Sequence, residues 1–337
     1  MEGRSFQSAN LARGASRIRV YLLPRSGFAL ALLANLIWGT SFLASKVTLM
    51  VWGPFTASAL RFAAAIAGML VLLPALGLPI QVPRSRGAWW RVLLIGVSGF
   101  GLLYPLQLAG LTAIPSSLSA AIMLTSPLFV LMFSAGFLRE PLSQQKLFAI
   151  GLGIIGGVVL VSPSTFAGSS WTMTTLPRLM GGFLLTLAAS LSLAISVVAT
   201  RSVSRDLDSR SLTFWSMCVG EALLIPLAFF EKQPMPAGAS LSQAVLALIF
   251  LALFCSVFAF LIWNRALAIS SPQEIASTMH VKTPVAVLLG IAVAGEPMTF
   301  SIIAGSILIS FAVGLSQWQP KSKPLAPATG TPEGVAT

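Results

Sequence analysis

Five ionisable side chains interrupt long apolar stretches of the sequence, where they could hold a charged solute or carry a proton. They are Lys46, Arg61, Glu221, His280 and Lys282. Placing such a group at bilayer depth costs roughly 2.5 to 3.5 kcal/mol, so it usually faces an aqueous cavity or a partner. These residues are therefore the first candidates for a functional site.

Glu221 and Lys282 have opposite charges and lie at comparable depth, each near the centre of its apolar stretch. One interpretation is a structural ion pair that ties two helices together. The other makes Glu221 a proton carrier, because a carboxylate in a desolvated site changes its ionisation when its partner leaves. The sequence leaves both interpretations open.

Lys282 is also a candidate substrate ligand, together with His280. The two residues are two positions apart, hence about 200° around an ideal helix, and cannot both face one cavity squarely. Pro284 removes the hydrogen bond that would reach the carbonyl of His280. A free carbonyl beside an ammonium would suit a zwitterionic or anionic ligand. We rank Lys282 above His280, for which packing is the alternative.

Arg61 and Lys46 lie closer to the ends of their apolar stretches. Arg61 follows Pro54 by seven residues, about 10 Å along a helix at 1.5 Å per residue. We expect it to line the outer vestibule or to cap backbone carbonyls. For Lys46 we expect the long stem to extend to the lipid headgroups.

Six further side chains suggest a solute pathway: Trp38, Ser41, Tyr104, Gln107, Met123 and Trp263. Trp38 is too deep in its helix for an interfacial aromatic belt, and with Ser41 it marks an amphipathic face. Tyr104 and Gln107 are spaced i and i+3, so they form a second polar strip. We assign these six residues to substrate binding, with core packing as the alternative for each one.

Catalytic and metal-binding patterns are absent from the sequence. The single histidine has no aspartate in any apolar stretch, and there is no HExxH motif or paired-aspartate arrangement. Cys218 and Cys255 lie in apolar runs without metal-ligand spacing and are interpreted as small buried residues. We expect no enzyme activity, no metal and no cofactor.

Composition indicates an all-α integral membrane protein. Of 337 residues, 56% are hydrophobic and 9% are charged, against roughly 25% charged residues in soluble domains. At about 20 residues per crossing, the apolar region holds ten transmembrane helices. We predict them near residues 27–47, 54–75, 92–112, 116–137, 145–162, 180–200, 211–230, 242–264, 273–294 and 300–317.

The net charge of +12 follows from membrane orientation and not from nucleic-acid binding. If both termini are cytoplasmic, 16 of the 21 basic residues fall in cytoplasmic segments, as the positive-inside rule requires for ten helices. The remaining basicity suits anionic lipid headgroups. We therefore expect a multi-pass protein of the cell inner membrane with lipid and a small solute as its partners.

The sequence contains a repeat. The segment from Pro127 to Glu140 is echoed from Pro284 to Glu296, and small residues in the fifth and tenth helices also correspond. Five spans per copy make the second copy enter the membrane upside down, so we predict two inverted five-helix repeats. The predicted divisions are a cytoplasmic segment (1–26), the repeats (27–163 and 178–317) and a disordered tail (318–337).

Several of these motifs together resemble the EamA-like exporters of the drug/metabolite transporter superfamily. They are residues 35–42 (Asn-Leu-Ile-Trp-Gly-Thr-Ser-Phe), Arg61-Phe62, the two Glu-Pro segments and residues 262–265 (Ile-Trp-Asn-Arg). The resemblance implies export of a small metabolite, such as an amino acid, by alternating access and proton antiport. An intramembrane enzyme and a non-transporting scaffold or sensor are the alternatives, and a homodimer stays open beside a monomer.

Overall fold

The computed structural model describes residues 26–138, 143–160, 175–201, 207–231, 240–269, 278–296 and 299–317, and every regular element in these ranges is a helix. The first repeat contains α2 (Gly27–Thr48), α3 (Pro54–Ala75), α4 (Arg86–Ile95), η1 (Gly96–Leu102), α5 (Leu103–Leu111), α6 (Ser116–Met123), α7 (Ser126–Leu138) and α8 (Gln144–Leu160). The second contains α9 (Thr175–Arg201), α10 (Ser209–Phe230), α11 (Leu241–Phe250), η3 (Leu251–Phe258), α12 (Ala259–Ile269), η4 (Met279–Val281), α14 (Lys282–Ala292) and α15 (Phe300–Gln317).

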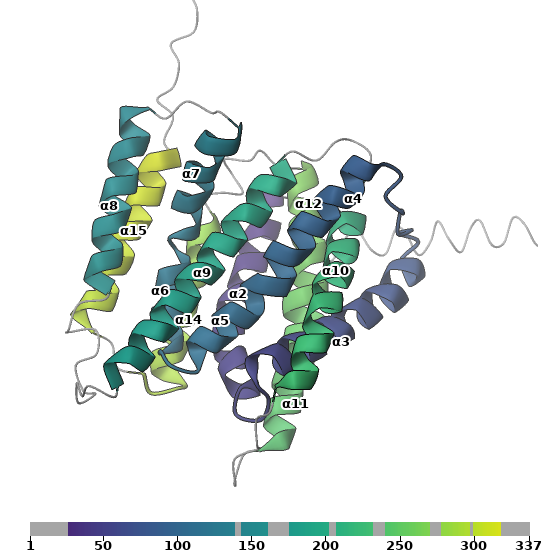
Figure 1. The fold of residues 1–337 in the computed structure, drawn as a ribbon, viewed down its shortest axis with the longest axis horizontal. Coiled ribbons are helices and arrows are strands. Elements are labelled where there is room, and N and C mark those ends of the chain that lie inside the picture. Colours follow the sequence, from purple (N-terminus) through teal and green to yellow (C-terminus); the bar gives the residue numbers. More distant parts are fainter. Residues whose placement is uncertain are drawn as a thin grey trace, which may run out of the picture.

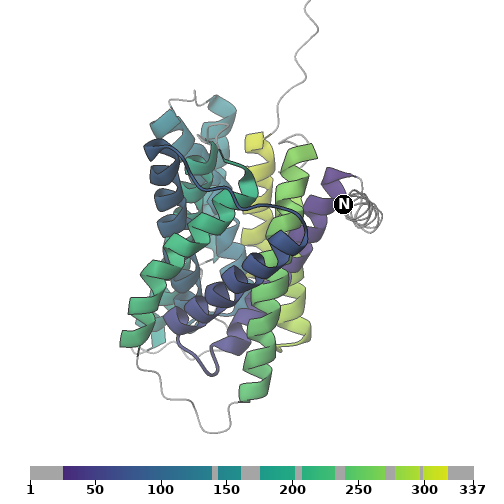
Figure 2. The same cartoon turned by 90° about the vertical axis from the view of Figure 1, so that its right-hand side faces the viewer.

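Several of these elements continue one another and form helices of membrane-spanning length. Eight helices of the described residues are long and apolar enough to cross a bilayer, and two shorter apolar helices, Gln144–Leu160 and Met279–Ala292, complete the predicted ten. Most of these helices run along a common direction (Figure 2). The predicted spans are confirmed within a few residues at most ends, and the third begins earlier, because Ser85 caps the first turn of α4 by accepting a hydrogen bond from Ala88 N.

The fifth helices of the two repeats, α8 and α15, pack together at one edge of the molecule (Figure 1). They are antiparallel, since Gln145 near the start of α8 bonds the carbonyl of Leu315 near the end of α15. Gly156 meets Gly305 at the crossing, where a Cβ on either would lie 3.1 or 2.9 Å from the carbonyl oxygen of the other. The small residues predicted at matching depths thus permit close backbone approach.

Equivalent positions make equivalent contacts between the repeats. Asn35 of α2 donates to the hydroxyl of Thr278 at 3.0 Å, and Ser190 of α9, 155 positions later, lies 2.9 Å from the hydroxyl of Thr125. In each case the first helix of one repeat contacts the fourth span of the other. The two inverted repeats therefore interlock through a crossed pair of polar contacts.

The third and fourth spans of both repeats are interrupted at corresponding places. The third spans carry the π-helical segments η1 and η3, which begin 155 residues apart. The fourth spans break just before Pro127 and Pro284. Proline's missing N–H predicted a lost hydrogen bond at Pro284, whereas the break before Pro127 was not predicted. These interruptions free backbone groups inside the bundle, where regular helices would offer none.

The segment before residue 26, Glu140 and the tail after residue 317 lie outside the described residues. The predictions made for them stay predictions.

Candidate functional site

Trp38 of α2 is the centre of a group of aromatic rings contributed by both repeats. Its ring centroid lies 5.3 Å from those of Phe260 and Trp263 on α12. Its indole N–H donates to the carbonyl of Cys255 in η3 at 2.9 Å. A π-helical segment thus supplies the acceptor that fixes a predicted site residue.

Arg61 of α3 extends this group of rings on its other side. Its guanidinium carbon lies 4.6 Å from the ring centre of Tyr104 and 5.5 Å from that of Phe62. Its Nε donates to the hydroxyl of Ser256 at 2.9 Å, and the residue is only 3% exposed. Arg61 is thus held by rings and a hydroxyl, whereas the sequence suggested a vestibule or capped carbonyls.

The rings form one continuous set, which we call the aromatic cluster: Trp38, Phe62, Phe100, Tyr104, Phe260 and Trp263. Phe100 of η1 makes the link, with centroids 5.3 Å from Phe62 and 5.8 Å from Phe260. The prediction included Trp38, Tyr104 and Trp263, named Phe62 only in a family motif, and missed Phe100 and Phe260. Their helical spacing, four residues before Tyr104 and three before Trp263, was the signal that could have found them.

Glu221 and Lys282 do not form the ion pair that the sequence made available. Neither takes part in an ion pair within the described residues. Glu221 is 7% exposed, and its Oε2 is fully buried and has no hydrogen-bond partner in the described part of the chain. The backbone of α14 at Lys282 packs so closely on α2 that a Cβ on Gly39 would lie 2.8 Å from its carbonyl oxygen. Lys282 and His280 are half-buried, and the Nδ1 of His280 is also sealed and unpartnered.

The other predicted residues lie around the middle of the bundle. Ser41 bonds the carbonyl of Trp38 at 2.6 Å, and Gln107 is half-buried. Met123 is buried beside Phe42 and Tyr104 in a small apolar cluster. Met123 thus has apolar neighbours, and the assignment of these side chains to the substrate path stays a prediction.

Glu296 joins the two repeats at one end of the bundle. Gly295, at φ +63°, turns the chain after α14, so that the carboxylate of Glu296 returns to the first repeat. There it accepts hydrogen bonds from Lys46 Nζ at 2.8 Å, from Ser116 N at 2.7 Å and Oγ at 2.9 Å, and from Ser117 N at 2.9 Å. Lys46 therefore has a protein partner, which the expected extension to the headgroups missed.

The pKa of Glu296 reflects these contacts. Burial alone would raise the pKa, but the hydrogen bonds from Lys46, Ser117 and Ser116 lower it more strongly, to about 2. The carboxylate therefore stays charged in the folded protein, where it caps N–H groups at the start of α6 that have no partner within the helix.

Glu231 repeats this arrangement on α3. Its carboxylate accepts hydrogen bonds from Phe55 N at 3.1 Å and Thr56 N at 2.7 Å, so the second repeat also caps a first-repeat helix here. We call Glu296 and Glu231, with the α6 and α3 N-termini that they cap, the carboxylate clasps. The sequence prediction left Glu231 out, because a carboxylate after a helix end gives no sign of a partner 175 residues away.

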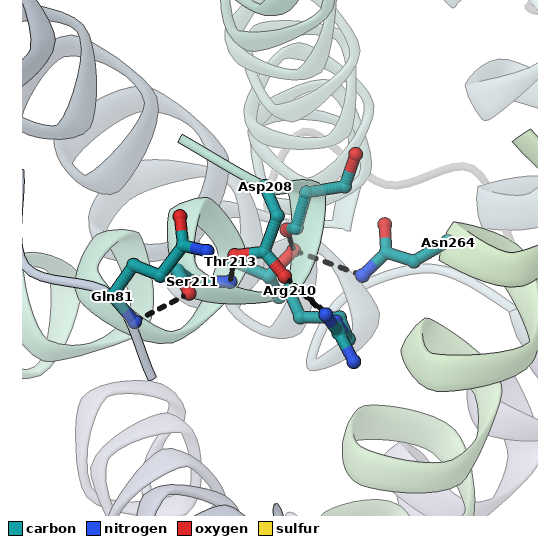
Figure 3. A network of polar contacts seen from close by, with 7 residues as sticks. Gln81, Asp208, Arg210, Ser211, Thr213 and Asn264 are labelled. Carbon is teal, nitrogen blue, oxygen red and sulfur yellow. Dashed lines mark hydrogen bonds and ion pairs between the residues drawn. The ribbon is translucent and has the colours of Figure 1, made fainter. Parts of the chain in front are cut away.

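The opposite end of the bundle holds a different contact between the repeats (Figure 3). Gln81 N donates to the hydroxyl of Ser211 at 2.9 Å. Trp215 donates back to the carbonyl of Gln81 at 2.9 Å. Asp208 caps α10 through Ser211 N and pairs with Arg210 at 2.7 Å. The two repeats are thus joined by polar contacts near both ends, on either side of the aromatic cluster.

Comparison with known proteins agrees with this architecture. The model of the EamA-like transporter family matches residues 25–162 and 180–317, hence both repeats. The chain belongs to the EamA-like transporter family. It is a multi-pass membrane protein built from two EamA units.

Similar EamA relatives are transporters by name. An uncharacterised transporter, YvbV of Bacillus subtilis (strain 168), is 26% identical over 93% of this chain and 99% of its own. The uncharacterised inner membrane transporter YedA of Escherichia coli (strain K12) is 29% identical over 82% of this chain and 85% of its own. A solved crystal structure with 21% identity superposes with a TM-score of 0.60, covering 87% of this chain and 98% of that one, and supports the fold.

Two apolar grooves of this EamA protein have linings that contain none of the predicted site residues. One, of about 750 Å³, runs between α14 and α15 past Pro284 and Phe311. The other, of about 700 Å³, runs between α7 and α8 past Met132 and Gly157. Their apolar lining suits lipid chains at the bundle surface, so the aromatic cluster remains the candidate site.

Proposed function

We propose that this EamA protein is a secondary transporter that exports a small metabolite, an amino acid or a related compound, in exchange for protons. The observation that carries the proposal is the aromatic cluster with Arg61, which lies where spans of both inverted repeats meet. Inverted repeats of this kind hold a central site and open it alternately to either side.

The proposal gives the predicted residues two roles, substrate binding and proton transfer. Trp38, Ser41, Tyr104, Gln107, Met123, Trp263, His280 and Lys282 line the substrate path, and Glu221 carries the proton. The support for Glu221 is its central, nearly sealed carboxylate, which has no ion-pair partner within the described residues. A buried carboxylate without a counter-ion readily exchanges its charge for a proton.

Orientation is part of the same proposal. With both termini in the cytoplasm, Ser143 lies on the cytoplasmic side and Ala294 outside, and both are exposed. Single-cysteine variants at these two positions, made after replacing Cys218 and Cys255, should react with an impermeant maleimide from opposite sides of the inner membrane. Labelling of both from one side would overturn the inverted arrangement.

Reconstitution tests the transport itself. Liposomes containing the purified protein are loaded with a mixture of amino acids and organic acids, and the outside is acidified. We expect mass spectrometry to show that at least one solute leaves faster than from protein-free liposomes and that the gradient accelerates its release. Chemical conversion without release would support an intramembrane enzyme, and neither conversion nor release would support a scaffold or sensor.

A further inference from the structure

Arg61 carries a permanent charge that the described protein does not neutralise. A guanidinium stays protonated in proteins, and this one is 3% exposed in the interior of the bundle. No described carboxylate lies within 4.0 Å of it, since the ion pairs among the described residues join Lys46 to Glu296 and Arg210 to Asp208. Such a cation in an apolar bundle calls for an anion from elsewhere.

The geometry leaves one edge of the guanidinium available. The rings of Tyr104 and Phe62 lie 4.6 and 5.5 Å away, and Ser256 occupies Nε. The four N–H groups on Nη1 and Nη2 donate to no acceptor in the described part of the chain. Neither nitrogen is among the fully buried atoms that lack a partner. These N–H groups therefore remain free to donate to a ligand, in an orientation fixed by the rings and Ser256.

A comparison of corresponding positions shows that only one of the two repeats carries this cation. The positions that correspond to Arg61 and Ser256, 155 residues away, are Ser216 and Gly101. The helices around them pack alike, because α3 lies against η3 as α10 lies against η1. A cation needed merely to hold these helices together would be expected twice, yet one repeat manages without it.

We propose that Arg61 is the anion-binding residue of this protein and that its two terminal nitrogens hold the carboxylate of a small organic acid. The proposal rests on the proposed transport function and names its substrate class. The planar fork of two parallel N–H groups matches the two oxygens of a carboxylate. Ser256 and the ring of Tyr104 act as positioning groups, because they fix the plane in which the fork lies.

Arg61 suits this role better than Lys282 does. An ammonium is a point charge on a flexible stem, whereas the guanidinium of Arg61 is already oriented by two rings and a hydroxyl. A fixed fork loses less entropy on binding a ligand. It also distinguishes a carboxylate from the amide of the same shape, and this distinction provides the test.

The test measures binding of benzoate and of its neutral isostere benzamide to the full chain in lipid nanodiscs by isothermal titration calorimetry. We expect wild-type protein to bind benzoate at least about tenfold more tightly than benzamide, a difference that one charge-assisted contact supplies. Arg61→Lys should lose that preference although the charge is kept. Arg178→Lys, at an exposed arginine that bonds the carbonyl of Thr112, should keep it.

Three results would overturn the proposal: no benzoate binding at 10 mM, equal affinity for acid and amide in the wild type, or an unchanged preference in Arg61→Lys. If Arg61→Lys fails to fold, Ser256→Ala serves instead and should reduce the acid preference by weakening the orientation of the fork; an unchanged preference there counts against the proposal. Benzoate binding without any solute flux in liposomes would refute transport and leave the anion site standing. Equal flux of neutral and acidic solutes would support transport and refute the anion site.

Discussion

Lys46 and Glu296 are 250 positions apart in sequence, yet their charged atoms lie 2.8 Å apart at one end of the bundle. Lys46 lies in the last turn of the first helix of the first repeat, and Glu296 belongs to the turn before the last helix of the second. The same carboxylate holds the N-terminus of α6. Movement of the repeats at this end must therefore break the carboxylate clasp or carry it along as a unit.

Replacing Glu296 by Gln should loosen this end. The side chain of Glu296 is 5% exposed, and a hydrogen bond to a charged group contributes about 1.5 to 3 kcal/mol. We expect Glu296→Gln to lower the free energy of unfolding by about 2 to 3 kcal/mol, measured by denaturation in detergent. Lys46→Met should cost less than about 1 kcal/mol, because that side chain is 37% exposed. Equal losses would contradict the dominance of the helix cap.

The stability contributed by Glu296 should depend on pH in the acid range. The pKa of its carboxyl is lowered from 4.5 to about 2 in the folded protein, so the folded state favours the charged form. Its contribution is fully present above pH 4.5 and is lost as the pH falls through that value toward 2. Melting temperatures of the wild type should fall across this window, and those of Glu296→Gln should fall less steeply. Parallel curves would remove Glu296 as the group responsible.

The second clasp can be tested without changing a charge. A Cβ on Gly53 would overlap the carboxylate of Glu231, so Gly53→Ala should displace it from the N-terminus of α3. We expect a loss of about 1 kcal/mol, as for other lost N-caps. Gly136→Ala on α7 is the matched control, since nothing lies within 4 Å of its added Cβ. If both variants unfold alike, Glu231 does not hold α3.

Hydropathy, proline positions and the repeated Glu-Pro segments were enough to predict ten helices in two inverted copies. These signals are local or periodic, so one chain suffices to detect them. The partners of Glu296 and Arg61 could not be found this way, because Ser116 and Ser256 reach them only through contacts between distant helices. Ser256 in particular is one ordinary serine in an apolar run, and its role depends on the π-helical turn that presents it.

The packing of α8 against α15 predicts that alanine at Gly156 and alanine at Gly157 have different effects on stability. The two helices cross at Gly156 and Gly305. In Gly156→Ala the new Cβ would lie 2.7 Å from Ile309 Cγ1, so we expect a destabilisation of about 1 to 3 kcal/mol from overpacking. Gly157→Ala, with nothing within 4 Å, should be neutral or slightly stabilising. The reverse order in denaturation experiments would refute this helix register.

Glu221→Gln tests the proposed proton coupling most directly. The amide keeps the size and shape of the side chain, and the sealed Oε2 has no partner to lose, so expression and folding should stay intact. Because an amide cannot take up a proton, we expect acidification outside the liposomes to stop driving export. Exchange of solute at equal pH on both sides should continue, since that mode needs no proton. Export that still follows the gradient would exclude Glu221 as the carrier, and loss of both modes would indicate that its carboxylate supports the substrate path itself.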